Sequence, residues 1–347
     1  MSPRLAASLL LVASLLVSAC SAVAAPPAAS PSDASPSDAS PSGSGSGSAS
    51  GPASGSITLY TSIQQPVVDA VLAAFKAAQP GVDVAVFRAA TGELSARLAT
   101  ELRTGGVKAD VLWLTDPLSM QGWAAQGVLA AWTPAGAEAL PAADRTDTSW
   151  ATRVLDIVIV RAVGRTDPDD WSDLAAADGG PVALPDPTFA GSALGALGYF
   201  ALEPGYGLDF YRRLKAAGAV QVQAPDDVTT GVAEGRFTAG MTLDSSAAAA
   251  AAKGSPVELV WPTDGAIAIP SPIGVVDRTD DPVAARALVE FLLSAAGQRA
   301  LADAGQQPVI AGSGGPQPGG PVVSPDWSAV FGRQDELLRE YAAIFGG

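Results

Sequence analysis

The feature that most constrains the fold of this chain is a regular alternation of short apolar strands and amphipathic helices, which begins at Ile57. The strands are predicted by alternating or continuous apolar runs, and the helices by apolar residues that recur every three or four positions. The connections between them are short, so this order predicts a parallel α/β sheet with right-handed crossovers. The predicted strands cover 57–61, 82–88 and 109–115, and the predicted helices start at Pro66 and just before Leu94.

The alternation continues through a second section. Further strands are predicted at 155–161, 182–184, 237–243 and 257–260, and helices at 192–201, 208–217, 228–234 and 247–252. An extended run with two prolines follows at 266–276. Asp281 and Pro282 are typical of an N-cap and a first helical position, so they open a helix predicted to end near Ala296. A last amphipathic helix is predicted over about 326–345.

The N-terminal residues are typical of an export signal. Arg4 precedes an apolar stretch, 5–17, that is too short to span a bilayer, and small residues lead to Cys20. The run Val17-Ser18-Ala19-Cys20 resembles the lipobox of bacterial lipoproteins, which implies that Cys20 becomes a lipidated N-terminus. The alternative is an ordinary signal peptide that is cut later, after Ala25.

A low-complexity segment follows the signal. From Pro26 to Ser56 every residue is Ala, Pro, Ser or Gly except Asp33 and Asp38. Such a segment buries too little apolar surface to offset its ordering entropy, and as a flexible coil it would span roughly 30 Å. We therefore expect a signal peptide at 1–19 and a lipid anchor with a disordered tether at 20–55, although a glycan-bearing stalk would have the same composition.

Composition excludes several classes of function. The chain has no His and one Cys, which removes His-based catalytic triads, His-ligated metals, internal disulfides and cysteine metal clusters. The net charge of −15 and the lack of a phosphate-binding glycine motif argue against nucleic acid and nucleotide partners. No cofactor is expected.

Several segments, in this order, resemble the extracellular solute-binding proteins of bacterial ABC importers, in the branch with ferric-ion, phosphonate, sugar-phosphate and thiamine binders. The likeness covers about 57–305 and includes TGEL at 91–94, ADVLWLTDP at 109–117, DPTFAGSA at 186–193 and KGSPVELVWPTDGAIAIPSPIGVV at 253–276. It implies an α/β, two-lobe periplasmic-binding-protein-like (type II) fold with a ligand cleft between the lobes. The implied divisions are lobe 1 at 56–155, lobe 2 with a hinge strand at 156–265, and a return crossing with C-terminal helices, mainly on lobe 1, at 266–347.

Two loop-to-helix junctions are candidate anion sites, Thr91-Gly92 and Gly191-Ser192. Each offers free backbone N–H groups, a hydroxyl and the positive end of a helix. The alternative for Thr91 and Ser192 is simple helix capping. The full candidate ligand-binding set is Thr61, Ser62, Arg88, Thr91, Gly92, Asp116, Thr188, Gly191, Ser192 and Asp244.

The resemblance implies a substrate-binding lipoprotein that captures a small anionic solute by lobe closure, with phosphonates or phosphorylated compounds favoured. Asp116 and Asp244 would then receive a cationic group of the solute. The alternative is a ferric-iron receptor. Gln64 stands where ferric binders carry a His, and the tyrosine-pair region reads Leu243-Asp244-Ser245, which leaves Tyr60, Asp116, Tyr199 and Asp244 as the conceivable iron ligands.

A secreted α/β hydrolase is the alternative from another class. The adjacent acids Asp169-Asp170 and Asp226-Asp227 would be its candidates, but neighbours on a chain usually point apart and no activated nucleophile is evident. We therefore expect an exported, non-enzymatic monomer that is anchored to the outer face of the cytoplasmic membrane as a lipoprotein or, alternatively, is periplasmic. Its expected partners are a small solute, an ABC permease with its ATPase and, through the lipid, the membrane.

Overall fold

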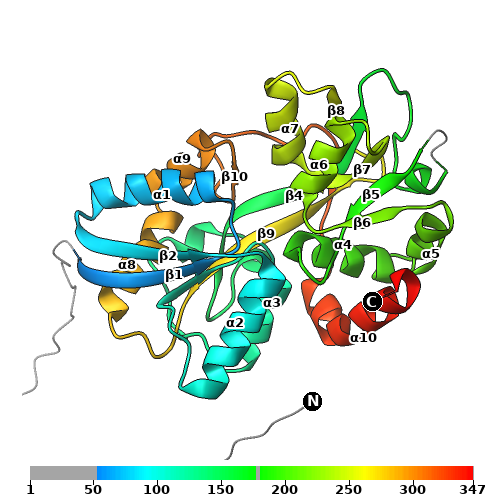
Figure 1. Cartoon of the computed structure of the whole chain (residues 1–347). Coiled ribbons are helices and arrows are strands. Elements are labelled where there is room, and N and C mark those ends of the chain that lie inside the picture. Colours follow the sequence, from blue (N-terminus) through cyan, green and yellow to red (C-terminus); the bar gives the residue numbers. More distant parts are fainter. Residues whose placement is uncertain (1–52, 177–179, 347) are drawn as a thin grey trace, which may run out of the picture. The chain divides into compact units, whose positions relative to one another are not determined.

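The computed structural model describes residues 53–176 and 180–346, so the predicted signal peptide, Cys20 and nearly all of the tether lie outside the described residues. Within the described residues eleven strands form one sheet, in which β2, β1, β3, β9, β4, β7, β5 and β6 are successive neighbours (Figure 1). The strands are β1 (Ser54–Thr61), β2 (Gly81–Arg88), β3 (Val111–Trp113), β4 (Trp150–Ala162), β5 (Val182–Pro185), β6 (Val220–Val222), β7 (Ala239–Leu243), β8 (Val257–Val260), β9 (Ala266–Val275), β10 (Gln307–Pro308) and β11 (Val322–Val323). The end of the predicted tether is wrong, because Ser54 and Gly55 pair with β2 as part of the first strand, which therefore starts before Ile57.

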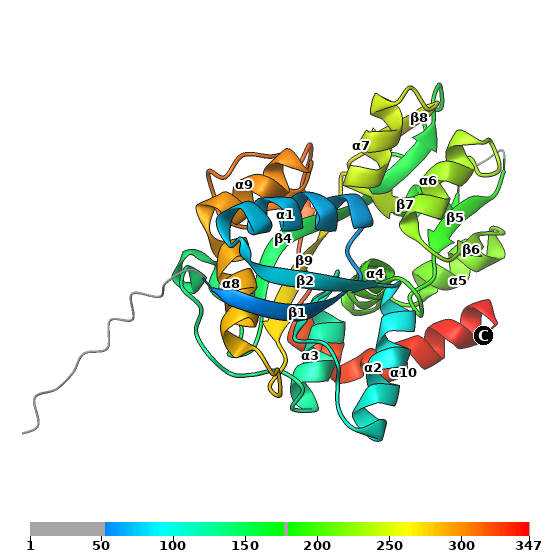
Figure 2. The ribbon, with the colours of Figure 1, turned by 60° about the vertical axis from the view of Figure 1, so that its left-hand side comes forward.

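The first parallel section consists of β2, β1 and β3, as the sequence predicts. Side chains alternate across β1, so Ile57 and Leu59 pack in one core while Tyr60 packs in another. Helices α1 (Gln65–Ala78), α8 (Pro282–Leu293) and α9 (Ala295–Asp303) supply the first core, and α2 (Thr91–Thr104) and α3 (Pro117–Ala125) supply the second. Figure 2 shows α1 on one side of β1 and β2, and α2 with α3 on the other.

Two long strands connect the first section to the rest of the sheet. β4 and β9 pair with each other antiparallel, and β9 also pairs antiparallel with β3. They contain the predicted strand at 155–161 and most of the predicted extended run at 266–276, and they run through the middle of the folded part in Figure 1. Pro270 and Pro272 of β9 face β4 where its register shifts between Ala151 and Arg153. A bulge at this point lets a strand with prolines keep neighbours on both sides.

The second parallel section consists of β7, β5 and β6. Helices α6 (Pro225–Ala233) and α7 (Asp244–Ala252) pack with Val160 of β4 in the core on one face. Helices α4 (Gly191–Leu202) and α5 (Asp209–Ala216) pack with Ile157 and Ile159 in the core on the other face. The two faces of β4 therefore belong to different cores.

The C-terminal helices divide between these cores. Side chains of α8 and α9 lie in a core of the first section, whereas Val330, Leu337 and Tyr341 of α10 (Trp327–Phe345) lie in the core with α4 and α5. α10 also packs against α3. The lobe boundaries given above stay predictions.

Among the described residues no helix combines the length and apolar character needed to cross a membrane.

Two helices were not predicted from the sequence. α3 has a typical helix start, with Asp116 as its N-cap and Pro117 as its first residue, but the helix has only nine residues and begins shortly after β3. The helix predicted to run to Ala296 ends at Leu293, because the Ser294 side chain accepts the N–H of Gly297 at 3.2 Å and starts α9.

Candidate functional site

The N-termini of α2 and α4 meet at one cavity. This cavity, the junction pocket, has a volume of about 80 Å³. Five of the ten predicted ligand-binding residues line it, although they come from distant parts of the chain: Ser62, Arg88, Thr91, Gly191 and Ser192. The two loop-to-helix junctions are thus brought together in space.

Neither helix is capped by a side chain. The N-cap residues are Ala90 for α2 and Ala190 for α4, so Thr91 and Ser192 lie inside their helices and do not cap them. The capping interpretation of these two residues is therefore wrong. Among the described residues no side chain accepts the first N–H groups of α4, and such groups at a helix start carry a partial positive charge.

A group of hydroxyls lies beside these helix ends. Thr115 follows β3 and its Oγ1 lies 3.2 Å from both Ser62 Oγ and Thr91 Oγ1. Its backbone N–H donates to Ser62 Oγ at 3.0 Å. Thr115 lines the junction pocket as well, and the sequence analysis passed over it although it stands at a predicted strand end. Arg88 is exposed at the rim, where its Nε donates to the Ile63 carbonyl at 3.2 Å.

Two glycines allow the segments around the junction pocket to approach closely. A Cβ on Gly92 would lie 2.3 Å from the Thr188 carbonyl oxygen, and the Gly92 N–H donates to the Phe189 carbonyl at 3.2 Å. A Cβ on Gly191 would lie 1.9 Å from Asp116 Oδ2. Any other residue at either position would push the start of its helix away from the facing segment.

The remaining predicted residues lie around the pocket rather than on its lining. Thr61 is buried, and its Oγ1 donates to the Trp113 carbonyl at 2.7 Å. Thr188 is exposed and its Oγ1 donates to Asp186 at 2.7 Å. Asp116 is the buried N-cap of α3 and accepts the N–H and Oγ of Ser119, so its oxygens already have donors. Burial raises the pKa of Asp116 above its usual value.

A larger cavity adjoins the junction pocket. It has a volume of about 490 Å³, within the usual range for small-molecule sites, and it shares Gln64 and Asp226 with the junction pocket. Its wall comes from the first turn of α1, from α6 and α7, and from residues that follow α7 and precede β10. It includes Thr229, Thr230, Ser245, Ser246, Lys253 and Gln306. The junction pocket therefore lies beside a cavity large enough for a small molecule.

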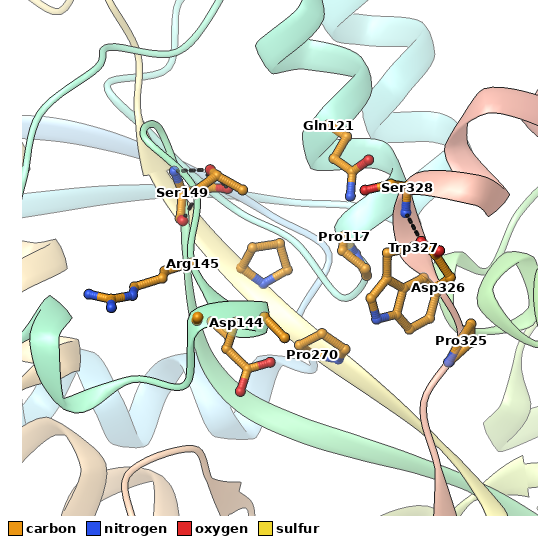
Figure 3. A pocket seen from close by; sticks show the side chains of 15 residues that line it. Pro117, Gln121, Asp144, Arg145, Ser149, Pro270, Pro325, Asp326, Trp327 and Ser328 are labelled. Carbon is orange, nitrogen blue, oxygen red and sulfur yellow. Dashed lines mark hydrogen bonds between the residues drawn. The ribbon is translucent and has the colours of Figure 1, made fainter.

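A third cavity, of about 360 Å³, is lined by Pro270 and Pro272 of β9 together with residues of α3 and of the start of α10. Figure 3 shows this cavity from close by. Figure 3 shows the Trp327 indole on one side and the Asp144 carboxylate on another. None of the predicted ligand-binding residues lines this cavity.

Residues 57–307 match the family of bacterial extracellular solute-binding proteins. The chain belongs to this family. No curated protein sequence matches the chain at a significant level. The solute-binding proteins of this family serve as the substrate-binding components of ABC importers.

Solved structures share the two-lobe fold of type II periplasmic binding proteins. AfuA from Actinobacillus pleuropneumoniae, with fructose-6-phosphate bound, has a TM-score of 0.75 and 17% identity, over 84% of this chain and 99% of its own. Iron-bound HitA from Pseudomonas aeruginosa has a TM-score of 0.72 and 19% identity, over 82% of this chain and 99% of its own. An ABC transporter substrate-binding protein from Agrobacterium tumefaciens has a TM-score of 0.75 and 19% identity, over 86% of this chain and 96% of its own.

The conceivable ferric ligands of this solute-binding protein are not brought together. Tyr60 is buried beside α2 and its hydroxyl donates to Glu101 at 2.8 Å. Tyr199 packs on Phe200 in the core with α4 and α5, and Asp116 caps α3. Among the described residues no group of three or more His, Cys, Asp or Glu side chains could hold a metal ion.

The solute-binding protein also has a charge cluster, formed by the buried Arg153 and Asp156 and the half-buried Asp244. The sequence analysis named Asp244 but missed Arg153 and Asp156. Arg153 and Asp156 are fully buried on β4, and Asp244 opens α7. Burial lowers the pKa of Arg153 to about 9, and burial with the nearby Asp244 charge raises the pKa of Asp156 to about 7. The signal was present in the sequence, because Arg153 and Asp156 interrupt a long apolar strand.

Proposed function

We propose that this solute-binding protein captures a small anionic solute at the junction pocket, with a phosphonate or a phosphorylated compound favoured, and delivers it to an ABC permease. The observation that carries the proposal is the meeting of two uncapped helix N-termini at one cavity. Backbone N–H groups and the helix dipole both favour an anion at such a position.

The hydroxyls around the pocket suit the same kind of ligand. Ser62, Thr91 and Ser192 can each donate to an oxygen of a phosphoryl or phosphonate group, and Thr115 adds a fourth hydroxyl. Arg88 at the rim supplies a full positive charge. The sugar phosphate in AfuA is consistent with this class of solute.

The proposal includes the predicted attachment. Cys20 carries a lipid, the Ala/Pro/Ser/Gly segment is the tether, and the folded part works as a monomer outside the cytoplasmic membrane. Solute capture by closure of the lobes and transfer to the permease involve no chemical step, so the protein acts without enzymatic activity or a cofactor.

Thermal-shift and calorimetric titration of the purified protein with phosphonates, sugar phosphates, thiamine and ferric salts test the proposal. We expect stabilisation by a phosphonate or phosphorylated compound. Thr91→Val and Ser192→Ala should each weaken binding about tenfold or more, because a hydrogen bond to a charged group is lost. Thr100→Val changes an exposed threonine on the same helix and should leave the affinity unchanged. A visible tyrosinate-to-iron absorption band with Fe(III), and no response to any anion, would contradict the proposal.

A further inference from the structure

The Asp156 carboxylate is buried without a hydrogen-bond partner. None of its surface is exposed, and among the described residues neither carboxylate oxygen has a donor. The Nε of Arg153 is likewise buried and unpartnered. A buried carboxylate without donors is strongly disfavoured, so such a group points to something that supplies donors in another state of the protein.

The buried Arg153 and the half-buried Asp244 do not balance the charge of Asp156. Arg153 donates to the side chains of Gln64, at 3.2 Å, and Gln306. Its positive charge acts on Asp244, and Asp244 in turn acts on Asp156. Asp244 Oδ1 also accepts the Asp156 N–H at 3.4 Å. When Arg153, Asp156 and Asp244 are all ionised, the cluster carries one unbalanced negative charge, which a single cation would neutralise.

This cluster adjoins the proposed solute site. Leu243 lines the junction pocket and is followed directly by Asp244, while the next residue, Ser245, lines the larger cavity. Gln64, the partner of Arg153, lines both cavities. Side chains alternate along β4, so Asp156 lies on the same face of the strand as Val160. Helices α6 and α7 cover that face, and residues of both helices also line the larger cavity.

We infer that Asp156 and Asp244 form a cation subsite, and that the solute is a zwitterion with a primary ammonium group there and its anionic group at the helix N-termini. This inference rests on the proposed function for the anionic end of the solute. In this subsite Asp156 takes the role that the sequence analysis gave to Asp116. The Asp116 oxygens accept hydrogen bonds from Ser119, whereas the Asp156 oxygens have no donor. An ammonium group supplies three donors and one positive charge. The Asp156 oxygens have no donor, and the cluster of Arg153, Asp156 and Asp244 lacks the positive charge.

A matched pair of ligands tests the subsite, namely 2-aminoethylphosphonate and propylphosphonate, which differ only by an ammonium group in place of a methyl group. We expect the ammonium compound to bind about 10- to 100-fold more tightly to the wild-type protein. Asp156→Asn and Asp244→Asn should each reduce this ratio towards one while the affinity for propylphosphonate is kept. Asp277→Asn removes one exposed carboxylate and should leave the ratio unchanged.

The outcomes separate the two proposals. If both compounds bind the wild-type protein equally, or if neither variant changes the ratio, the cation subsite is wrong while the anion site stands. If neither compound binds, the proposed anion site fails and the subsite fails with it. Two variants are used because each alters a different element, β4 or α7, so a folding defect in one leaves the other informative.

Discussion

Replacement of Asp156 by asparagine should stabilise the solute-free protein, and the gain should depend on pH. Asp156 is fully buried on β4 without donors, and burial with the charge of Asp244 raises its pKa from the usual 3.8 to about 7. The folded protein therefore binds this proton more tightly than the unfolded chain does. The cost of the ionised carboxylate is absent below pH 3.8, grows as the pH rises and is fully present above about pH 7.

The size of the effect follows from the same pKa values. Each tenfold change in proton affinity corresponds to about 1.4 kcal/mol, so a shift from 3.8 to about 7 costs up to about 4 kcal/mol. Asparagine keeps the shape and removes the charge, but its amide is also left without partners. We therefore expect a gain of about 1–3 kcal/mol at pH 8 and almost none at pH 4.

Urea denaturation of the wild type and Asp156→Asn at pH 4, 6 and 8 measures this difference, with Asp277→Asn as a charge-matched surface control. The gap between wild type and Asp156→Asn should widen as the pH rises. A variant that is less stable than the wild type at pH 8, or a gap that does not change with pH, would refute the reasoning. Either result would mean that the carboxylate has donors and is not desolvated.

Two further predictions concern other parts of the molecule. Gly191→Ala places a Cβ 1.9 Å from Asp116 Oδ2, so overpacking of about 1–3 kcal/mol should weaken solute binding by about 5- to 150-fold. Gly332→Ala, where a Cβ meets nothing within 4 Å, should bind normally. Equal titration curves for Gly191→Ala and wild type would show that the close approach is not needed. Cys20→Ala should release the protein from the membrane fraction into the medium, as judged by immunoblotting after fractionation, and a variant that stays attached would exclude the lipid anchor.

The sequence predicted most of the elements because their signals are local. The alternating valines of β2, the leucine stripe of α2 and the Asp281-Pro282 start of α8 all lie where the patterns placed them. The resemblance to solute-binding proteins was confirmed over nearly the whole folded part of the chain. α3 and α9 were not predicted because each follows another element after a very short connection. The periodicity of apolar residues then does not show where the new helix begins.

The candidate site was predicted only in part. The junctions at Thr91 and Gly191-Ser192 were found because helix starts after strands have a local signature. Whether these hydroxyls cap their helices was not predictable, since it depends on one residue of register: alanines occupy both N-cap positions. Asp116 and Asp244 look equivalent in sequence, yet one caps a helix and the other adjoins an unpartnered carboxylate.

By itself, therefore, the sequence determined most of the order of strands and helices and the polar groups available at strand ends, because these depend on neighbours within a few residues. Only the tertiary structure decided that residues 62, 91, 115 and 192 share one pocket, and that Arg153 and Asp156 lose their water at the sheet centre. Both outcomes depend on contacts between residues far apart in the chain, and desolvation in particular is a property of everything packed around a group.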